Sequence, residues 1–323
     1  MAAAVESVSR SRWSRITAAV LPRLAFYPFL AASLLVFPSM IPWMVLGWLA
    51  LFALRRIRGK SAWPPLAFCL GILLVKRVDW PPGMILLGIC MVAGGALEIV
   101  RQKRPAWNRA AAAAAAALAV GWIAMALSWS QVGRTSRKPA LVEGRPVVCI
   151  GDSLTVGGFP RILEKRLRVP VLDLAEGGIT AAEGLRRFPD VLARKPQAVV
   201  IELGGHDSIR GRSRKDTRQD LAAMIGAARN GGAEVFLFEI PRGFITDPYA
   251  GLERELAREH DLELITDGAI RRLVLFSPFT PLGAWTGRQL SYDGLHPNEA
   301  GNAFLSDRVE AALRRVYGSA ILR

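Results

Sequence analysis

The sequence predicts an α/β fold with a parallel sheet in its second half, preceded by an all-α transmembrane region in its first half. Three observations support this prediction: strand-like and helix-like stretches alternate from Pro146 onward, long apolar runs fill the first half, and charge is divided unevenly between the halves. A chain of 323 residues is long enough for about two domains. We therefore expect a cytoplasmic basic segment, a transmembrane region, a linker and a C-terminal domain at residues 1–23, 24–129, 130–144 and 145–323.

Five apolar runs predict the transmembrane region. A spanning helix needs about 20 apolar residues, and the last two runs reach or approach that length. Pro38 and Pro42 separate the first two runs into a helical hairpin, because proline cannot continue the helical hydrogen-bond ladder. We expect five spans, with four as the alternative. The runs are 24–37, 41–54, 65–75, 84–100 and 110–129.

The distribution of charge predicts an orientation. Residues 1–140 contain 17 Lys and Arg against three acidic residues, whereas residues 141–323 contain 25 against 24. The basic residues form short clusters between apolar runs, which is typical of a membrane protein rather than of a nucleic-acid-binding surface. Basic clusters on the cytoplasmic side then place the second half outside the cytoplasm. We expect an integral protein of a bacterial inner membrane, with a periplasmic catalytic domain and no nucleic-acid partner.

The second half alternates five apolar strand-like runs with amphipathic helical stretches. Strands that are apolar almost throughout are typical of a parallel sheet covered by helices on both faces. In such sheets the active site lies beyond the carboxyl ends of the strands. The expected strands are 147–150, 169–174, 198–203, 234–240 and 262–265, and the expected helices are 160–166, 181–193, 216–230, 248–260 and 297–316.

Two polar motifs supply the groups that nucleophilic acyl transfer requires. Ser153 follows the first expected strand, and the second motif provides His296 with Asp293 three residues before it. A serine hydroxyl is a poor nucleophile at its own pKa, so it needs a base within hydrogen-bond reach and a group that orients the base. The alternative for the serine and the carboxylate is a capping role at the next helix, and for the histidine a place in the core.

Four short polar and glycine-containing blocks stand in the second half: Gly151-Asp152-Ser153-Leu154, Gly177-Gly178, Gly204-Gly205-His206-Asp207 and Asp293-Gly294-Leu295-His296. In this order they resemble the blocks of the SGNH (GDSL) hydrolases, over roughly residues 145–318. The resemblance is closest to the small bacterial thioesterase/lysophospholipase branch, and it implies a flavodoxin-like three-layer α/β/α domain.

The resemblance also implies a role for each block. Ser153 is the expected nucleophile, His296 the general base, and Asp293 the carboxylate that holds its ring. The expected oxyanion hole consists of the backbone N–H groups of Ser153 and Gly178 and the side chain of His206. The family normally has asparagine at this last position. A neutral histidine still offers one N–H donor and a protonated one offers two, so activity is expected with either side chain.

Four further residues are expected around the substrate. Asp152 and Asp207 flank the motifs and are more suited to bracing the site than to reacting. Arg210 belongs to the basic run 209–215, which either meets anionic groups or is a solvated loop. Trp285 ends an aromatic, proline-rich stretch that either lines an acyl pocket or contacts the membrane.

We therefore expect a membrane-anchored serine esterase that works outside the cytoplasm on lipid acyl esters or on O-acyl groups of envelope glycans. The alternatives are an O-acyltransferase that modifies an envelope glycan, and a weakly active binding module, which only the histidine at position 206 suggests. Three histidines, one of them in the motif above, do not indicate a metal centre. No cofactor is expected, and the expected partners are an acyl ester substrate and membrane lipids.

Overall fold

The computed structural model describes residues 41–58, 60–61, 63–76, 133–243 and 246–323. In the first half it contains a helical hairpin of α2 (Ile41–Ile57) and α3 (Trp63–Val75), which pack with the rings of Trp48 and Phe68 4.8 Å apart. These helices contain the second and third apolar runs. Among the described residues no helix is both long and apolar enough to cross a membrane. The expected all-α transmembrane region is therefore not supported, and its other three runs and the basic segment lie outside the described residues.

The second half contains the predicted parallel sheet. Its strands lie in the order β2-β1-β3-β4-β5, and every neighbouring pair is parallel. The order reverses direction between β1 and β3, and the carboxyl side of such a switch point is where α/β sheets bind ligands. Four strands lie within the expected ranges, and β1 extends one residue beyond its range. The strands are β1 (Val147–Gly151), β2 (Val171–Asp173), β3 (Ala198–Glu202), β4 (Glu234–Phe238) and β5 (Glu263–Ile265).

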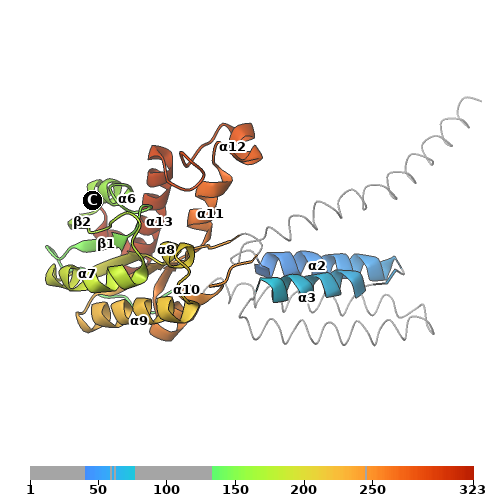
Figure 1. Cartoon of the computed structure of the whole chain (residues 1–323), viewed down its shortest axis with the longest axis horizontal. Coiled ribbons are helices and arrows are strands. Elements are labelled where there is room, and N and C mark those ends of the chain that lie inside the picture. The colour runs from blue at the N-terminus through green and yellow to red at the C-terminus, as the bar shows by residue number, and fades with distance from the viewer. Residues whose placement is uncertain (1–40, 59, 62, 77–132, 244–245) are drawn as a thin grey trace, which may run out of the picture.

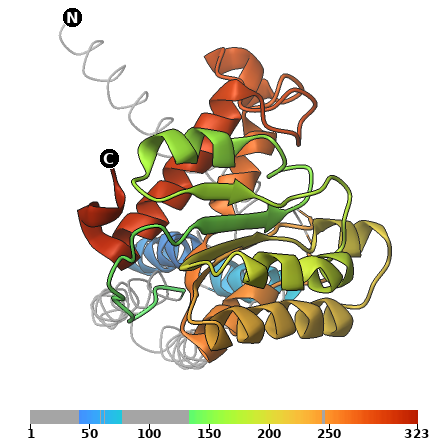
Figure 2. The same ribbon diagram turned by 90° about the vertical axis from the view of Figure 1, so that its left-hand side faces the viewer.

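Helices cover both faces of the sheet and complete three layers. Alternate strand residues point to opposite faces, so β1 contributes Val147 and Cys149 to one core and Val148 and Ile150 to the other. Figure 2 shows α6 and α13 on one side of the sheet and α7 and α9 on the other. Residues of α11 share the core of α6 and α13, and residues of α10 share the core of α7 and α9.

Five helices of the domain correspond to the five expected from the sequence, and four further helices were not expected. Figure 1 shows α8 among the helices at the sheet and α12 at the edge of the domain. The expected helices are α6 (Phe159–Arg166), α7 (Ala181–Ala193), α9 (Arg214–Asn230), α10 (Leu252–His260) and α13 (Glu299–Tyr317), and the additional ones are α8 (Gly205–Ile209), α11 (Gly268–Leu275), α12 (Pro281–Thr286) and the 3₁₀ helix η2 (Gly318–Ile321).

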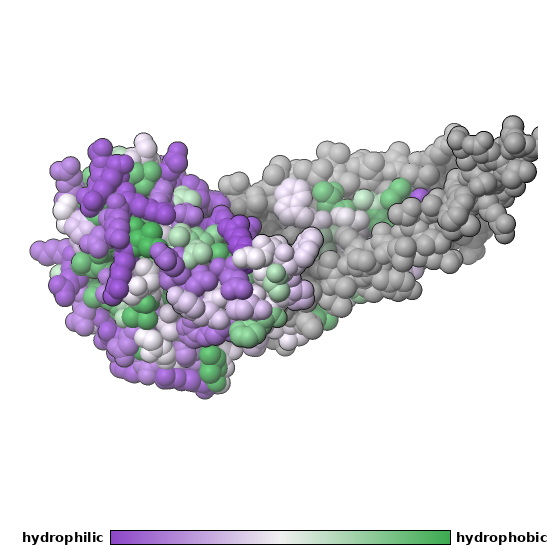
Figure 3. Space-filling model, turned by 90° about the horizontal axis from the view of Figure 1, so that it is seen from above, coloured by the Kyte–Doolittle hydropathy of each residue, from purple (hydrophilic) through white to green (hydrophobic). Residues whose placement is uncertain are grey.

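The described part of the expected linker is anchored to the domain. Leu264 N donates to Gly133 O at 2.6 Å, which extends hydrogen bonding beyond β5. Arg134 Nη1 then pairs with Glu263 Oε1 at 2.7 Å, and Ser136 Oγ donates to Asp261 Oδ2 at 2.7 Å. The face of the domain seen in Figure 3 is largely hydrophilic, with apolar residues scattered among polar ones.

Candidate active site

Ser153 lies at the tip of the turn that follows β1. Leu154 N donates to Asp152 Oδ1 at 3.0 Å and Thr155 N donates to Asp152 O at 3.1 Å, which closes the turn. Gly151 is required below it, because an added Cβ atom would lie 2.3 Å from Thr155 Oγ1. The turn therefore presents a half-buried hydroxyl at the carboxyl edge of the sheet.

The three residues expected to form a catalytic triad lie together. Ser153 Oγ is 3.0 Å from His296 Nε2, and His296 Nδ1 is 2.6 Å from Asp293 Oδ2. Ser153 and His296 are 143 residues apart in the chain. Their approach is therefore a consequence of the tertiary fold, and it gives the hydroxyl the base and the base the carboxylate that acyl transfer needs.

Asp293 is held as an ionised acceptor. Its hydrogen bond to the His296 ring, followed by those from the backbone N–H groups of His296 and Leu295, holds the pKa of Asp293 well below its usual range. Hydrogen bonding to the charged form of a carboxyl favours that form. The side chain of Asp293 is 54% exposed, so this candidate triad is open to solvent at its carboxylate end.

A glycine loop lies directly against the candidate nucleophile. A Cβ atom added at Gly177 would lie 3.9 Å from Ser153 Cβ, and one added at Gly178 would lie 3.9 Å from His206 Cε1. Gly178 has a φ of +81°, a conformation that favours glycine. Arg210 Nη2 donates to Gly178 O at 2.7 Å and fixes this peptide. The loop therefore lies beside both Ser153 and the His206 ring.

His206 is positioned by the sharp turn from β3 into α8. Gly204 has a φ of +112°, and an added Cβ atom would lie 2.5 Å from Arg242 Nη2. Arg242 Nε donates to Gly204 O at 3.0 Å, and Arg242 Nη2 pairs with Glu253 Oε1 at 2.5 Å. Both charged side chains of this pair are 2% exposed. A buried ion pair thus holds the turn that carries His206.

The side chain of Asp207 holds together the elements around the candidate site. Its side chain is fully buried, and Oδ2 accepts from Ala181 N, the first residue of α7, at 2.7 Å. Oδ1 accepts from Arg212 Nε at 2.9 Å and from Thr217 Oγ1 at 3.0 Å. Asp207 therefore joins α7, α8 and α9, which fits the bracing role, and its expected contact with substrate stays a prediction.

The basic run 209–215 is largely neutralised by carboxylates. Arg210 Nη1 lies 3.1 Å from Glu183 Oε2, Arg212 Nη2 lies 2.5 Å from Asp220 Oδ2, and a third arginine of the run pairs with a glutamate of α10. Glu183 is itself part of a capping box on α7, where the N–H of Thr180 lowers its pKa to about 2. This pattern favours a structural role for Arg210 at the glycine loop over attraction of an anionic partner.

The aromatic stretch before Asp293 exposes two large apolar side chains, one of which lies near the loop that carries Asp293. Trp285 on α12 is 87% exposed and Phe279 is 75% exposed. A Cβ atom added at Gly294, next to Asp293, would lie 3.7 Å from Phe279 Cδ2. Solvated apolar side chains next to a reactive centre are available to contact an acyl chain or another apolar surface.

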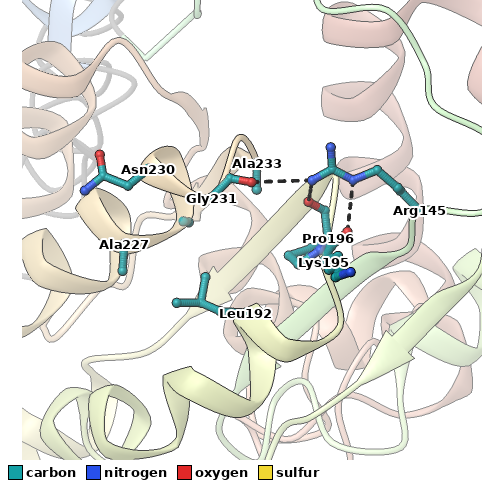
Figure 4. A pocket seen from close by; sticks show the side chains of 9 residues that line it. Arg145, Leu192, Lys195, Pro196, Ala227, Asn230, Gly231 and Ala233 are labelled. Atoms are coloured by element: carbon teal, nitrogen blue, oxygen red, sulfur yellow. Dashed lines mark hydrogen bonds between the residues drawn. The ribbon is translucent and has the colours of Figure 1, made fainter.

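A separate hollow lies at the amino ends of β3 and β4. Its lining includes Pro196, Ala233 and Arg145, whose guanidinium donates to the carbonyls of Lys195 and Pro196 at 3.0 and 2.6 Å (Figure 4). Since Ser153 lies beyond the carboxyl end of β1, this hollow is not the candidate active site. In the part of the chain that the structure describes, no group of three or more His, Cys, Asp and Glu residues is arranged to hold a metal ion.

Two buried side chains of the site were not singled out from the sequence. Glu202 ends β3 and accepts from Asp152 N at 3.3 Å and from Thr155 Oγ1 at 3.0 Å through Oε2. Arg242 holds the turn before His206, as described above. A glutamate at the end of an otherwise apolar strand is a signal for the first, whereas nothing in the local pattern distinguishes Arg242 from the other arginines.

Known proteins share the domain that carries this site. Residues 149–304 match the model of the GDSL-like Lipase/Acylhydrolase family. Esterase TesA of Pseudomonas aeruginosa is 38% identical over 107 residues, which cover 29% of this chain and 53% of that protein. Thioesterase 1/protease 1/lysophospholipase L1 of Escherichia coli K12 is 27% identical over 177 residues, which cover 50% of this chain and 79% of that protein.

A solved structure of TesA is 27% identical and covers 53% of this chain and 99% of its own, with a TM-score of 0.45. The matching part of this chain spans about half the length of the Pseudomonas relative. An arylesterase of Vibrio mimicus and an acetylxylan esterase of Xylanibacter ruminicola also match, at 26% and 25% identity, each over 52% of this chain. Residues 149–304 are thus similar to the GDSL-like Lipase/Acylhydrolase family, and several of the similar proteins are named esterases.

Proposed function

We propose that this protein is a serine esterase that hydrolyses acyl esters through an acyl-enzyme on Ser153. The observation that carries the proposal is the continuous hydrogen-bonded path from Ser153 Oγ through the His296 ring to Asp293, with distances of 3.0 and 2.6 Å. A capping serine or a core histidine does not need this arrangement.

In the proposed reaction His296 Nε2 takes the hydroxyl proton while Ser153 Oγ bonds to the ester carbonyl carbon. The carbonyl π electrons move to oxygen and give a tetrahedral oxyanion. When the intermediate collapses, the ester C–O bond breaks, and the alcohol leaves with the proton from His296. A water molecule then loses a proton to the same nitrogen, attacks the acyl-enzyme and releases the acid. Asp293 stabilises the imidazolium in both steps.

The oxyanion would be stabilised by donors around Ser153. The backbone N–H groups of Ser153 and Gly178 and one ring N–H of His206 are the groups at hand, since the glycine loop lies beside both side chains. Removing one such donor typically costs about 10²–10³ in rate. A ring donor in place of an amide therefore sustains turnover only if its N–H faces the oxyanion.

The substrate class is proposed from the surroundings of the site and from the relatives. The exposed Phe279 and Trp285 favour an acyl or lipid group, and one relative is named a thioesterase and lysophospholipase. Another relative is named an acetylxylan esterase, which supports O-acyl groups of a glycan. We propose lipid acyl esters or envelope-glycan O-acyl esters, both of which present the same carbonyl to Ser153.

We further propose that the esterase is anchored in a membrane with its catalytic domain outside the cytoplasm, in the periplasm of a bacterium. This rests on the sequence: five apolar runs and a balance of 17 basic to three acidic residues within residues 1–140. Enzymatic reporters fused after Arg323 test it, because a reporter that works only in the cytoplasm would overturn the orientation.

The second candidate is an O-acyltransferase, in which a sugar hydroxyl replaces water in the second step. The five apolar runs in the first half of the sequence favour this candidate, because a membrane anchor alone requires fewer spans. Both candidates are tested by incubating the full chain with p-nitrophenyl acetate and butyrate, with and without a soluble glycan acceptor. Free acid formed without the acceptor and lost in Ser153→Ala supports the esterase. Turnover only with the acceptor supports the transferase, and no turnover with either supports a binding module.

A further inference from the structure

Two carboxyl groups are buried together behind the candidate oxyanion hole. Asp152 and Glu202 are 3% and 2% exposed, and Glu202 Oε2 accepts from the backbone N–H of Asp152 at 3.3 Å, so the two carboxyl groups share one buried site. Two carboxyl groups that share a buried site do not both ionise, because like charges and burial disfavour the second charge. The pair therefore holds one proton and one negative charge.

The contacts of each carboxyl group indicate where the proton lies. Burial, followed by the charge of Asp152, raises the pKa of Glu202 well above its usual range. Glu202 Oε1 is buried and accepts no hydrogen bond from the described residues. Asp152 Oδ1, in contrast, accepts from Leu154 N at 3.0 Å, which favours the ionised form. Glu202 is thus the acid and Asp152 the carboxylate.

The second carboxyl oxygen of Asp152 lies near His206. Asp152 Oδ2 is 3.9 Å from His206 Nε2, too far for a direct hydrogen bond but close enough for electrostatic attraction. Asp207, on the same short helix as His206, is already paired with Arg212. His296 also acts electrostatically on Asp152.

We propose that Asp152 and Glu202 are positioning residues for His206: by holding one proton between them, they place a single negative charge beside Nε2 and keep the ring N–H on that nitrogen. An amide needs no such device, because its donor nitrogen is fixed. A neutral imidazole can carry its proton on either nitrogen, and Nε2 is the nitrogen that lies 3.9 Å from Asp152 Oδ2. The inference rests on the proposed function only for its catalytic consequence.

The tautomer itself can be measured without any activity. The full chain has only three histidines, so ¹⁵N NMR of histidine-labelled protein resolves them, and His206→Asn assigns the signal. We expect the proton on Nε2 in the wild type and a mixture of tautomers in Asp152→Asn. Asp173→Asn is the matched control, because Asp173 ends the neighbouring strand β2 and also accepts two backbone N–H groups, those of Gly157 and Ala175. An unchanged His206 signal in Asp152→Asn would overturn the proposal.

A double-mutant cycle tests the catalytic consequence. We expect Asp152→Asn to lower kcat/KM about tenfold or more in the wild-type background and less than about twofold in the His206→Asn background, because coupled residues are not additive. Equal losses in both backgrounds would show that Asp152 acts through His296 or through the turn alone.

Two Glu202 variants separate proton donation from packing. Glu202→Gln keeps an N–H donor toward Asp152 and should retain kcat/KM within about threefold, whereas Glu202→Leu, of similar size without a donor, should lose tenfold or more. Equal losses would contradict the shared proton. A protein that shows the Asp152-dependent tautomer but hydrolyses no ester and is not labelled by a fluorophosphonate would refute the proposed function while leaving the positioning inference in place.

Discussion

Replacing Asp293 with asparagine tests the electrostatic part of the candidate triad while leaving its loop intact. Asp293 Oδ1 accepts from the N–H groups of His296 and Leu295 at 2.8 and 3.0 Å, and an asparagine oxygen can keep both bonds. At the other oxygen, 2.6 Å from His296 Nδ1, the amide would present a donor instead of an acceptor. The ring would then carry its proton on Nε2 and could no longer accept the proton of Ser153.

The expected magnitude follows from the exposure of this carboxylate. The same change in a buried serine-protease triad lowers kcat about 10⁴-fold. The side chain of Asp293 is 54% exposed, so water can solvate both the amide and the imidazolium, and we expect a smaller loss of about 10²–10³-fold. The assay is kcat/KM for p-nitrophenyl butyrate, together with the rate of fluorophosphonate labelling, which does not depend on deacylation.

Asp307→Asn is the matched control, because Asp307 is similarly exposed and pairs with Arg166 on α6, away from Ser153. It should retain kcat/KM within about twofold, since exposed ion pairs contribute little. A loss of less than threefold in Asp293→Asn, with its labelling rate unchanged, would refute the role given to Asp293.

Three further predictions follow from the structure. His206→Ala should lower kcat/KM about 10²–10³-fold while His206→Asn stays within about tenfold of the wild type, and equal losses would refute a donor role. In the unfolded chain Glu202 loses its proton above about pH 4.3, whereas in the folded protein its raised pKa keeps the proton, so the stability of the wild type falls as pH rises toward that folded pKa. The melting temperature of Glu202→Gln should therefore rise relative to that of the wild type between about pH 5 and about pH 8. A difference that stays constant over this range would contradict the raised pKa of Glu202. Asp207→Ala should lower the free energy of unfolding by about 2–4 kcal/mol, because Ala181 N, Arg212 Nε and Thr217 Oγ1 each lose a buried hydrogen bond to its carboxylate. A loss below about 1 kcal/mol in thermal unfolding would refute the bracing role.

The fold of the second half was predictable because its elements differ in hydrophobic pattern. β1 and β3 are buried at all five positions, so they form apolar runs that are visible in sequence. The helices α8 and α12 have five and six residues, too few for a recognisable period, and α12 begins in a stretch rich in proline. Residues 130–144 read as a linker because they lack periodicity, but the hydrogen bonds that anchor Gly133 and Ser136 involve β5 and its neighbours, far along the chain.

The candidate site was predictable where chemistry depends on residue type within a short motif. Ser153, Asp293 and His296 belong to such motifs, and the structure brings them together. Glu202 and Arg242 could not be assigned, because their roles depend on partners about 40 to 50 residues away, Asp152 in the first case and Gly204 in the second. The two interpretations of the basic run could not be separated for the same reason, since the sequence does not show that Arg210 pairs with Glu183.

The central claim is that Ser153 becomes covalently acylated. Intact-mass analysis of the full chain, quenched during turnover of p-nitrophenyl butyrate and followed by peptide mapping, tests it directly. We expect a butyryl adduct on the peptide that contains Ser153, absent in Ser153→Ala and formed far more slowly in His296→Ala. Ester hydrolysis that persists in Ser153→Ala, or an adduct that maps to another residue, would contradict the account.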